Sequence, residues 1–560
     1  MKYNNNKLLN ALFLYFIFTA STFADVANNT HQTEQDKARQ SALKPEQQDY
    51  QSSRTGSHKY KLIFPVEETC RYISHVNIIS SNEKLTQRLL RNIAVQAEKK
   101  CLGIKGIRQL ATALQNEIIV QGYITSLIDI PSQSLEDGVL DITLTYGKIG
   151  NMIWSADSGA TSSLWNAIPT ATGEILKLTD LEQGMANLQR LPGSSAQMKI
   201  QPGKNNAESD IQITRNLAKK WQVSAWMDDA GSRESGRYQS GGALYLYDMA
   251  TLNDIFYVSA GGDVEFNQHN DGNHNSSLYY SVPVGYWSLS LYGSQSEYRQ
   301  QFKANYSTTE YKSENRYASA TLSRLLSHTR QQKTTLDARI AKSTSRYYFG
   351  GSELKVMRKQ NPVWELTLRQ QRYFNKKIID ASLGIQRSLP WLSSMPTLEE
   401  KAGLYSPLSR VIHADIQAFM KFDITGDRFS YAPHINAQFS PDILSTDNKF
   451  NIGSRWTVRG FDGENSLSGN QGWYWRNDFI WDMPTPDRQL YFGLDIGRIT
   501  GSEQYRQGKV ISGAVSGLRG QLFSTQYDFL SVRRSLNPIV FIAIRSTLVS
   551  RSTGGINVVK

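Results

Sequence analysis

The pattern of apolar and polar residues changes near residue 220. Between Ile107 and Ile118, apolar residues recur every three or four positions, which places them on one face of a helix. From Trp221 onward this helical period disappears, and in Trp287–Tyr292 apolar residues alternate with polar ones, as they do again in Trp364–Arg369. The sequence therefore predicts a mixed α and β region followed by a long all-β region.

The mixed region is predicted to hold two small domains of the order β-α-α-β-β. In the first, strands are expected at Tyr72–Ile79, around Ile124–Ile130 and at Leu140–Tyr146, and helices at Leu85–Ala97 and around Ile107–Ile118. The second repeats this order. It has a strand at Lys148–Trp154, a short helix at Ser163–Ile168, a helix opened by the capping box Thr179–Glu182, and two strands around the turn Pro202-Gly203.

The all-β region suits a membrane barrel better than a soluble sandwich. Aromatic residues make up 11% of the chain, and there are 28 Tyr, 11 Trp and 40 Gly. Tyr279, Tyr280, Tyr286 and Trp287 stand at predicted strand ends, where they would suit a bilayer interface. The mean hydropathy of −0.45 agrees with strands that face lipid with only alternate residues. At roughly 20 residues per strand with its connection, about sixteen strands are expected.

The N-terminus predicts export. Lys2 and Lys7 precede the apolar run Leu8–Phe18, and a small-residue site ends at Ala24, as in a secretory signal peptide. A signal anchor is the alternative, but the apolar run is short. The polar segment 25–58 is either a disordered tail or, around Thr33–Gln40, a mobile helix.

Composition argues against several classes of function. The net charge is +12, but the basic residues form no tract, so no nucleic-acid partner is expected. The eight histidines have no metal spacing, and neither a Gly-x-Ser-x-Gly elbow nor a phosphate-binding glycine loop is present. The chain is therefore not expected to be an enzyme or to need a cofactor or metal.

Cys70 and Cys101 are the only cysteines, and both lie in the exported part. An oxidising compartment favours a disulfide between them. Metal binding is the alternative, but no histidine lies at ligand spacing from either cysteine; His75 is the nearest.

The string Val458-Arg459-Gly460-Phe461 lies in a polar stretch, and Asp495 stands alone on a predicted apolar strand two residues before Gly497. Arg459 and Asp495 form a candidate charge pair, which could hold a loop inside a larger structure. On local chemistry alone, an arginine beside a glycine in a loop is usually solvated, and an aspartate on a strand usually faces water.

The whole layout resembles the outer-membrane transporters of two-partner secretion, called TpsB proteins, of the Omp85 superfamily, whose small domains are POTRA domains. Val458–Phe461 is similar to the superfamily's long extracellular loop, and Asp495 with Gly497 is similar to its barrel-wall motif. The cysteines fall where the haemolysin-transporter branch has a pair. Other similar segments are Gly122–Thr125 with Ile130-Pro131 and Leu140–Ile142, and Asp180–Gly184 through Leu188–Gly193.

The resemblance implies a fold of periplasmic POTRA domains followed by an all-β barrel of about sixteen antiparallel strands. The implied division is a signal peptide at 1–24, a plug helix and linker at 25–60, POTRA domains at 61–147 and 148–217, and a barrel at 218–560 with a long loop at 451–472. The loop would fold into the lumen, where Arg459 pairs with Asp495. A helix from Thr33 to about Gln48 would plug the pore.

The implied function is passage of a large unfolded exoprotein from the periplasm to the cell surface or medium of a Gram-negative bacterium. Haemolysins, adhesins and contact-dependent-inhibition toxins are the cargo classes of such transporters. The expected partners are the exoprotein at the POTRA domains, outer-membrane lipid and the barrel assembly machinery, and the expected state is a monomer. An outer-membrane assembly factor of the same superfamily and a passive porin are the alternatives.

One feature departs from this resemblance. Such barrels usually close with a strand that ends in an aromatic residue, which the assembly machinery reads. Here the last clear predicted strand is Ile539–Ile544, and the chain ends in the polar stretch Gly554–Lys560.

Overall fold

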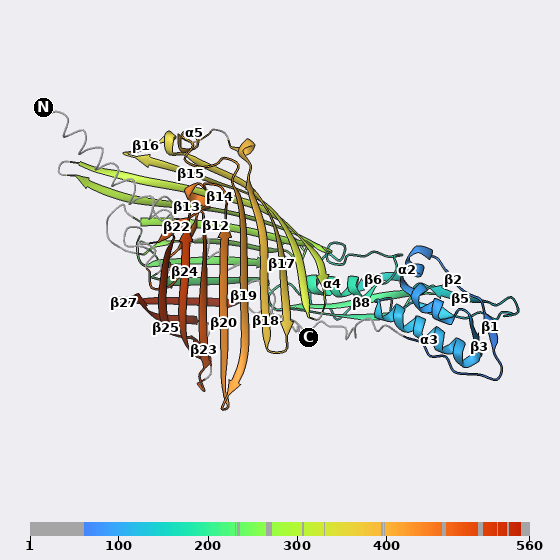
Figure 1. Cartoon of the computed structure of the whole chain (residues 1–560). Coiled ribbons are helices and arrows are strands. Elements are labelled where there is room, and N and C mark those ends of the chain that lie inside the picture. The colour runs from blue at the N-terminus through green and yellow to red at the C-terminus, as the bar shows by residue number, and fades with distance from the viewer. Residues whose placement is uncertain are drawn as a thin grey trace, which may run out of the picture.

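The computed structural model describes residues 61–549 except 230, 232–235, 265–271, 305–306, 330, 394–395, 397, 462–465, 486, 502–507, 523–524 and 535–536. The predicted signal peptide and plug helix lie outside the described residues. Two small domains extend from one end of a closed barrel (Figure 1). Among the described residues, no helix combines the length and the apolar character needed to cross a membrane.

The first small domain packs two helices on a three-stranded sheet of order β2-β5-β4, in which β2 and β5 are parallel. Leu90, Leu110, Leu114 and Ile142 are fully buried between these layers. A further two-stranded antiparallel sheet, β1 with β3, was not predicted. The elements are β1 (Arg71–Ile73), β2 (His75–Ser80), α2 (Glu83–Ala94), η1 (Val95–Ala97), β3 (Lys100–Leu102), α3 (Ile104–Val120), β4 (Leu127–Asp129) and β5 (Val139–Thr145).

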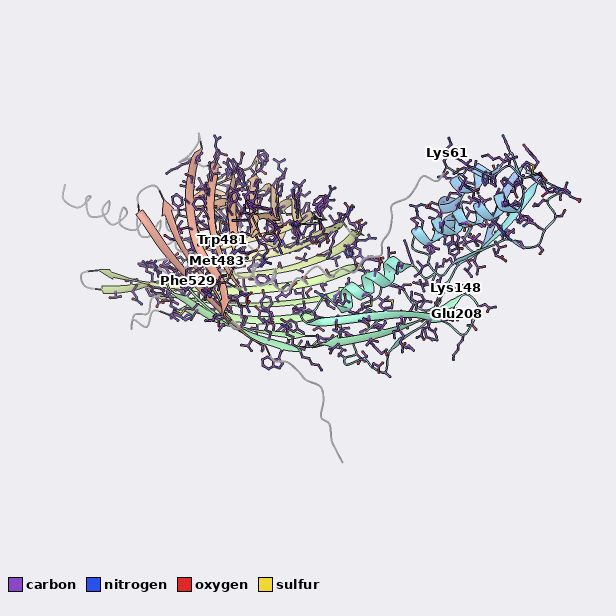
Figure 2. The ribbon with its side chains drawn as sticks, turned by 90° about the horizontal axis from the view of Figure 1, so that it is seen from below. Lys61, Lys148, Glu208, Trp481, Met483 and Phe529 are labelled. Atoms are coloured by element: carbon purple, nitrogen blue, oxygen red, sulfur yellow. A yellow bond between two sulfur atoms is a disulfide. The ribbon has the colours of Figure 1, made fainter. Side chains whose placement is uncertain are left out.

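The second small domain has one helix on a sheet of order β6-β8-β7. Figure 2 shows Lys148 beside Glu208 at its start, where β6 and β8 pair in parallel. Its core contains Leu176, Leu181 and Ile211. The elements are β6 (Lys148–Trp154), α4 (Leu178–Leu188), β7 (Ser194–Pro202) and β8 (Glu208–Leu217).

Two local predictions in this domain were wrong. Residues 163–168 form a turn with one hydrogen bond, from the Ile168 N–H to the Leu164 carbonyl, and not a short helix. The capping box is also absent, because α4 begins at Leu178 and Lys177 supplies no side-chain cap. The Leu178 N–H donates to the Gly122 carbonyl of the first domain, so the contact between the domains determines where the helix begins.

The barrel is closed by sixteen long antiparallel strands in the described part of the chain, which confirms the predicted fold class. The two-residue strand β16 adds to the tip of β15. The strands are β9 (Trp221–Asp228), β10 (Gln239–Tyr247), β11 (Ile255–Asp263), β12 (Gly272–Val284), β13 (Trp287–Ala304), β14 (Ser307–His328), β15 (Gln332–Phe349), β16 (Ser352–Glu353), β17 (Lys359–Phe374), β18 (Lys377–Ser388), β19 (Arg410–Ile424), β20 (Asp427–Phe439), β23 (Gln471–Asp482), β24 (Arg488–Thr500), β25 (Lys509–Leu522), β26 (Thr525–Arg534) and β27 (Asn537–Val549).

The last strand is longer than predicted. β27 continues past Ile544 to Val549, because the polar residues Arg545 and Ser546 pair with Trp226 and Ala225 of β9. This pairing closes the barrel. Short helical turns lie in the connections between other barrel strands. They are η2 (Lys355–Met357), η3 (Pro390–Leu392), α5 (Leu398–Lys401) and η4 (Thr446–Asn448).

The outer face of the barrel is apolar. On β24, Leu490, Phe492, Leu494 and Ile496 are exposed, whereas the residues between them are buried. An exposed apolar row on a closed barrel is the surface that lipid covers. The alternation predicted from the sequence therefore places apolar residues toward lipid and the residues between them toward the lumen.

The sequence predicted that the aromatic residues at these strand ends face the bilayer, but not all of them do. Trp287 is outward and exposed, with the Arg324 guanidinium 4.9 Å from its ring. Tyr286 instead donates to Asp180 of the second small domain at 2.5 Å, and Tyr279 stacks on Tyr257 on the inner side. These tyrosines join the barrel to the domain beside it.

Strands β13, β14 and β15 extend beyond their neighbours at the end far from the small domains (Figure 1). β14 has 22 residues, about twice the roughly 9–11 that a membrane-spanning strand needs. Tyr298, Tyr311 and Tyr347 form a buried cluster in the extension, covered by Leu354 and Met357. The extension is therefore a packed sheet outside the membrane.

A buried ion pair fixes the second small domain to the barrel. Arg215 of β8 is fully buried, and its Nη1 lies 2.7 Å from Asp248 Oδ2 in the turn between β10 and β11. Ser162 and the Asn253 N–H also donate to Asp248 Oδ1. The two parts therefore meet through charge neutralisation and hydrogen bonds, with Leu191 packed against the barrel tyrosines nearby.

Asp248→Ala is expected to loosen this junction, because it leaves the buried Arg215 charge unpaired at a local cost of about 3–5 kcal/mol. Trypsin cleavage at Lys219 and Lys220, which join the domain to β9, should become at least about tenfold faster in the folded protein. The exposed Asp157 of the same domain provides the control, and Asp157→Ala should leave cleavage unchanged. Equal cleavage of both variants would show that the pair does not hold the junction.

The N-terminal segment of the first domain is fixed to α3. The Glu67 carboxylate accepts hydrogen bonds from the backbone N–H groups of Gly103, Lys105 and Gly106 at 2.8–3.1 Å. A side chain at Gly103 would collide with Glu67, so this glycine makes room for the carboxylate. The Lys105 N–H contributes most to lowering the pKa of Glu67; burial opposes it, and the Gly106 and Gly103 N–H groups add to the lowering.

Because this pKa lies below its ordinary value of 4.5, the stabilisation by Glu67 is complete above about pH 4.5 and is lost as the pH falls through the folded-state value. In Glu67→Gln, amide exchange at the start of α3 should be faster than in the unsubstituted chain at pH 7. The difference should shrink below pH 4.5. Glu68→Gln, at the exposed neighbouring position, is the control. A difference that persisted at pH 3 would contradict a role for the carboxylate charge.

Candidate functional site: an arginine held inside the barrel

The connection between β20 and β23 folds into the barrel. It contains the short hairpin β21 (Phe450–Ile452) with β22 (Leu467–Gly469). Together with Val458, this hairpin packs against Tyr474 of β23 and Ile499 of β24. The loop spans 440–470, so it begins earlier than the predicted 451–472. It also ends earlier, because Gln471 and Gly472 already pair with β24 in the wall.

Asp495 points into the barrel. On β24 the inward row is Tyr491, Gly493, Asp495, Gly497 and Ile499, all of them buried, and Asp495 is only 2% exposed. The strand alternation that sends leucine and phenylalanine outward therefore places one carboxylate in a poorly solvated position. Such a charge requires a partner.

Arg459 supplies that partner. Its Nε lies 2.6 Å from Asp495 Oδ2 and its Nη2 lies 2.7 Å from Asp495 Oδ1, a two-point contact. The Arg459 backbone N–H donates to the same carboxylate at 3.0 Å. The arginine is 4% exposed. The carboxylate therefore fixes both the side chain and the main chain of the loop at this residue.

Asp478 is a second acidic partner, and the sequence analysis missed it. Its Oδ1 lies 2.6 Å from Arg459 Nη2, from the neighbouring strand β23. On the same strand, Arg476 donates to the Trp456 carbonyl of the loop at 2.7 Å. The alternation of Trp473 and Trp475 with inward residues could have revealed both positions. Two arginines and two aspartates together make the cluster neutral.

Three glycines form the surface on which the loop rests. A Cβ atom at Gly493 would lie 2.6 Å from Arg459 Nη2, and one at Gly497 would lie 2.8 Å from Val458. At Gly513 of β25 it would collide with the Arg459 carbonyl oxygen. Gly497 belonged to the predicted wall motif, whereas Gly493 and Gly513 were not predicted. The absence of a side chain at these three positions leaves room for Val458, for the Arg459 guanidinium and for the Arg459 carbonyl.

The other predicted loop residues complete the packing. Gly460 has a φ of +107°, a left-handed conformation in which other residues are strained. Phe461 packs beside Ile511 at the edge of the loop core. A separate ion pair joins Arg455 to Asp229, just after β9, at 3.3 Å. The barrel closes where β27 pairs with β9. The loop is attached to β23, β24 and β25 on one side of this pair and to Asp229, just after β9, on the other.

Cys70 and Cys101 are joined by a disulfide in the first small domain, far along the chain from the loop. Within the described residues, no group of three or more histidine, cysteine, aspartate or glutamate side chains could hold a metal ion. The two carboxylates of the barrel site, Asp495 and Asp478, are both bonded to Arg459.

An apolar-faced barrel with an inward-folded loop and two small domains at one rim defines an outer-membrane barrel protein with periplasmic domains. Residues 207–520 match the family described as haemolysin secretion/activation protein ShlB/FhaC/HecB. Residues 72–147 match the ShlB-type POTRA domain, and residues 148–202 match a POTRA domain.

Similar proteins agree with these matches. The outer membrane transporter CdiB-2 of Burkholderia pseudomallei is 30% identical over 80% of this chain and 78% of its own length. The hemolysin transporter protein HpmB of Proteus mirabilis is 24% identical over 79% and 78%. The structure of CdiB from Acinetobacter baumannii superposes with a TM-score of 0.82 at 23% identity, over 94% of this chain and 99% of that one, and so shares the fold.

The chain belongs to the haemolysin secretion/activation family of two-partner secretion, whose members are outer-membrane transporters. Its barrel lies in the outer membrane, and its two POTRA domains lie in the periplasm.

Gly513→Ala is expected to displace the loop, because the new methyl group would collide with the Arg459 carbonyl. The barrel should still insert, but protease should cut the loop within 453–461, which should stay protected in the unsubstituted protein. Gly293→Ala is the matched control on β13, since its nearest neighbour would be 3.9 Å from the methyl group. Protection of the loop in both variants would show that the glycine surface does not position it.

Proposed function

We propose that this chain moves one large unfolded exoprotein across the outer membrane, by capture at the POTRA domains followed by passage through the barrel lumen. The observation that carries the proposal is the arginine held by two carboxylates inside a barrel whose one rim carries the POTRA domains. The chain acts as a monomer and without catalysis or a cofactor. The barrel assembly machinery inserts it, and outer-membrane lipid covers its apolar face.

Capture uses the edge strands of the POTRA domains. In the first domain, β2 is an edge strand with His75, Asn77 and Ile79 exposed. In the second domain, β6 and β7 are the edges. An extended segment that adds to such an edge gains main-chain hydrogen bonds with little demand on its sequence. This suits a long exoprotein that arrives unfolded.

Passage requires an open lumen. The predicted helix Thr33–Gln48 leaves the pore when cargo arrives, and folding of the exoprotein outside makes the transfer irreversible. Arg459 and Asp495 hold the loop against β24 and β25, so that the lumen keeps the shape that permits conduction. Substituting one partner strands a poorly solvated charge at a local cost of about 3–5 kcal/mol.

The alternative function, assembly of other outer-membrane proteins, is less well supported. The family match covers the barrel, and the similar curated proteins named here are transporters. The chain also has two POTRA domains, where an assembly factor usually carries more.

Arg459→Ala is expected to leave the barrel in the outer membrane but to lower secretion at least about tenfold, because the buried Asp495 and the half-buried Asp478 would lose their cation. The assay co-expresses the large exoprotein encoded beside this chain and quantifies it in the medium. Arg459→Lys should also fail, since an ammonium group cannot make the two-point contact.

Arg324→Ala is the control, because it removes an arginine from the outer face of β14. Normal secretion by Arg459→Ala would overturn the role of the pair. An exoprotein that stayed in the periplasm although the unsubstituted barrel is inserted would overturn the transport proposal itself.

A further inference from the structure

The first described residues, Lys61–Val66, lie on the first POTRA domain as an extended segment (Lys61 in Figure 2). Leu62 and Phe64 turn inward and pack against the domain core, whereas Ile63 is 79% exposed and Val66 is fully exposed. Residues 61–65 therefore alternate between exposed and inward positions as a strand does. It pairs with no strand of the described sheets. We call Lys61–Val66 the strap.

Two glutamine side chains hold the backbone of the strap. Gln96, in the turn after α2, accepts a hydrogen bond from the Leu62 N–H at 2.8 Å. Gln109 of α3 donates to the Ile63 carbonyl at 3.1 Å. A side-chain amide offers both a donor and an acceptor, and here it recognises peptide groups and not side chains. Any extended segment could make these two bonds.

The side-chain contacts of the strap, like its backbone hydrogen bonds, do not require one particular sequence. The Lys100 ammonium lies 4.9 Å above the Phe64 ring. A cavity beside the strap is lined by its residues together with Lys100 and Cys101. We call the surface formed by Gln96, Lys100 and Gln109 the strap groove. It accepts two large apolar side chains, two residues apart, on an extended backbone.

The downstream end of the strap is fixed much more firmly than the strap itself. Glu67 accepts three backbone hydrogen bonds from the start of α3, and Cys70 is bonded to Cys101. The strap can therefore leave the groove while the chain from Glu67 onward stays in place. Residues 61–66 also continue directly from the segment in which the plug helix is predicted.

We propose that the strap groove is a binding site for an extended segment of the exoprotein, with apolar residues at positions i and i+2, and that the strap is its resident competitor. This inference rests on the proposed function and names the place on the first POTRA domain where capture of the exoprotein begins. Cargo that enters the groove displaces Lys61–Val66 from the first POTRA domain.

The test uses the full-length chain in detergent and a fluorescent peptide that copies Lys61–Val66, with blocked ends. In the unsubstituted protein the tethered strap competes at an effective concentration in the mM range, so the peptide should bind weakly. Leu62→Ser with Phe64→Ser empties the groove, and the dissociation constant of the peptide should fall at least about tenfold. Ile63→Ser with Val66→Ser, at the two exposed positions, is the matched control and should change nothing.

Adding Gln96→Ala and Gln109→Ala to the emptied variant should abolish the gain, because the groove then no longer holds a peptide backbone. A second measurement avoids substitutions. Saturating peptide should increase amide exchange at Leu62 in the unsubstituted chain while the amides of Lys105 and Gly106, held by Glu67, stay protected. Equal affinity of the emptied and unsubstituted proteins, or unchanged exchange at Leu62, would overturn the proposal.

These results are independent of secretion. If the peptide does not bind but the exoprotein still reaches the medium, only the strap groove is disproved. If the peptide binds as expected but no exoprotein is released, the transport proposal fails, and the groove stands as a peptide-binding site whose occupant is not an exported protein.

Discussion

The structure depends on neutralising charge inside the barrel. Arg459 is nearly inaccessible to water, and its partners Asp495 and Asp478 come from two adjacent strands. Because a strand alternates with a period of two, a slip of one residue in β24 would turn Asp495 into the lipid and leave Arg459 without its main partner. The register of the wall and the position of the loop are therefore determined together.

The components of this site could be read from the sequence to different degrees. Arg459 and Asp495 could be named because the strings that contain them, Val458–Phe461 and Asp495 with Gly497, resemble motifs of the superfamily. The alternation along β23 indicates that Asp478 faces inward, but its contact with Arg459 could not be predicted, and neither could the contact at Gly513. Both contacts depend on which strands are neighbours, and a single sequence does not contain that pairing. The sixteen-strand barrel could be predicted, since alternation persists over the whole second half of the chain.

The misjudged segments share a physical cause: local chemistry was overruled by contacts between domains. Leu178 bonds to Gly122, so α4 begins before the capping box. Tyr286 is aromatic and stands at a strand end, but Asp180 draws it to the POTRA domain and away from the bilayer. At these junctions the partner lies about 55 to about 105 residues away along the chain, beyond the reach of any local pattern.

A buried ion pair is a costly way to obtain stability, since well-packed apolar residues of similar volume often do as well. Its advantage is that it defines one geometry. The pair of Arg459 with Asp495 fixes the loop on a glycine surface, and the pair of Arg215 with Asp248 fixes the second POTRA domain on the barrel. The strap uses neither an ion pair nor sheet pairing, but two amides, two apolar side chains and the contact of Lys100 with the Phe64 ring. The molecule thus holds by charge the parts that must keep their place, and by weaker contacts the segment that has to move.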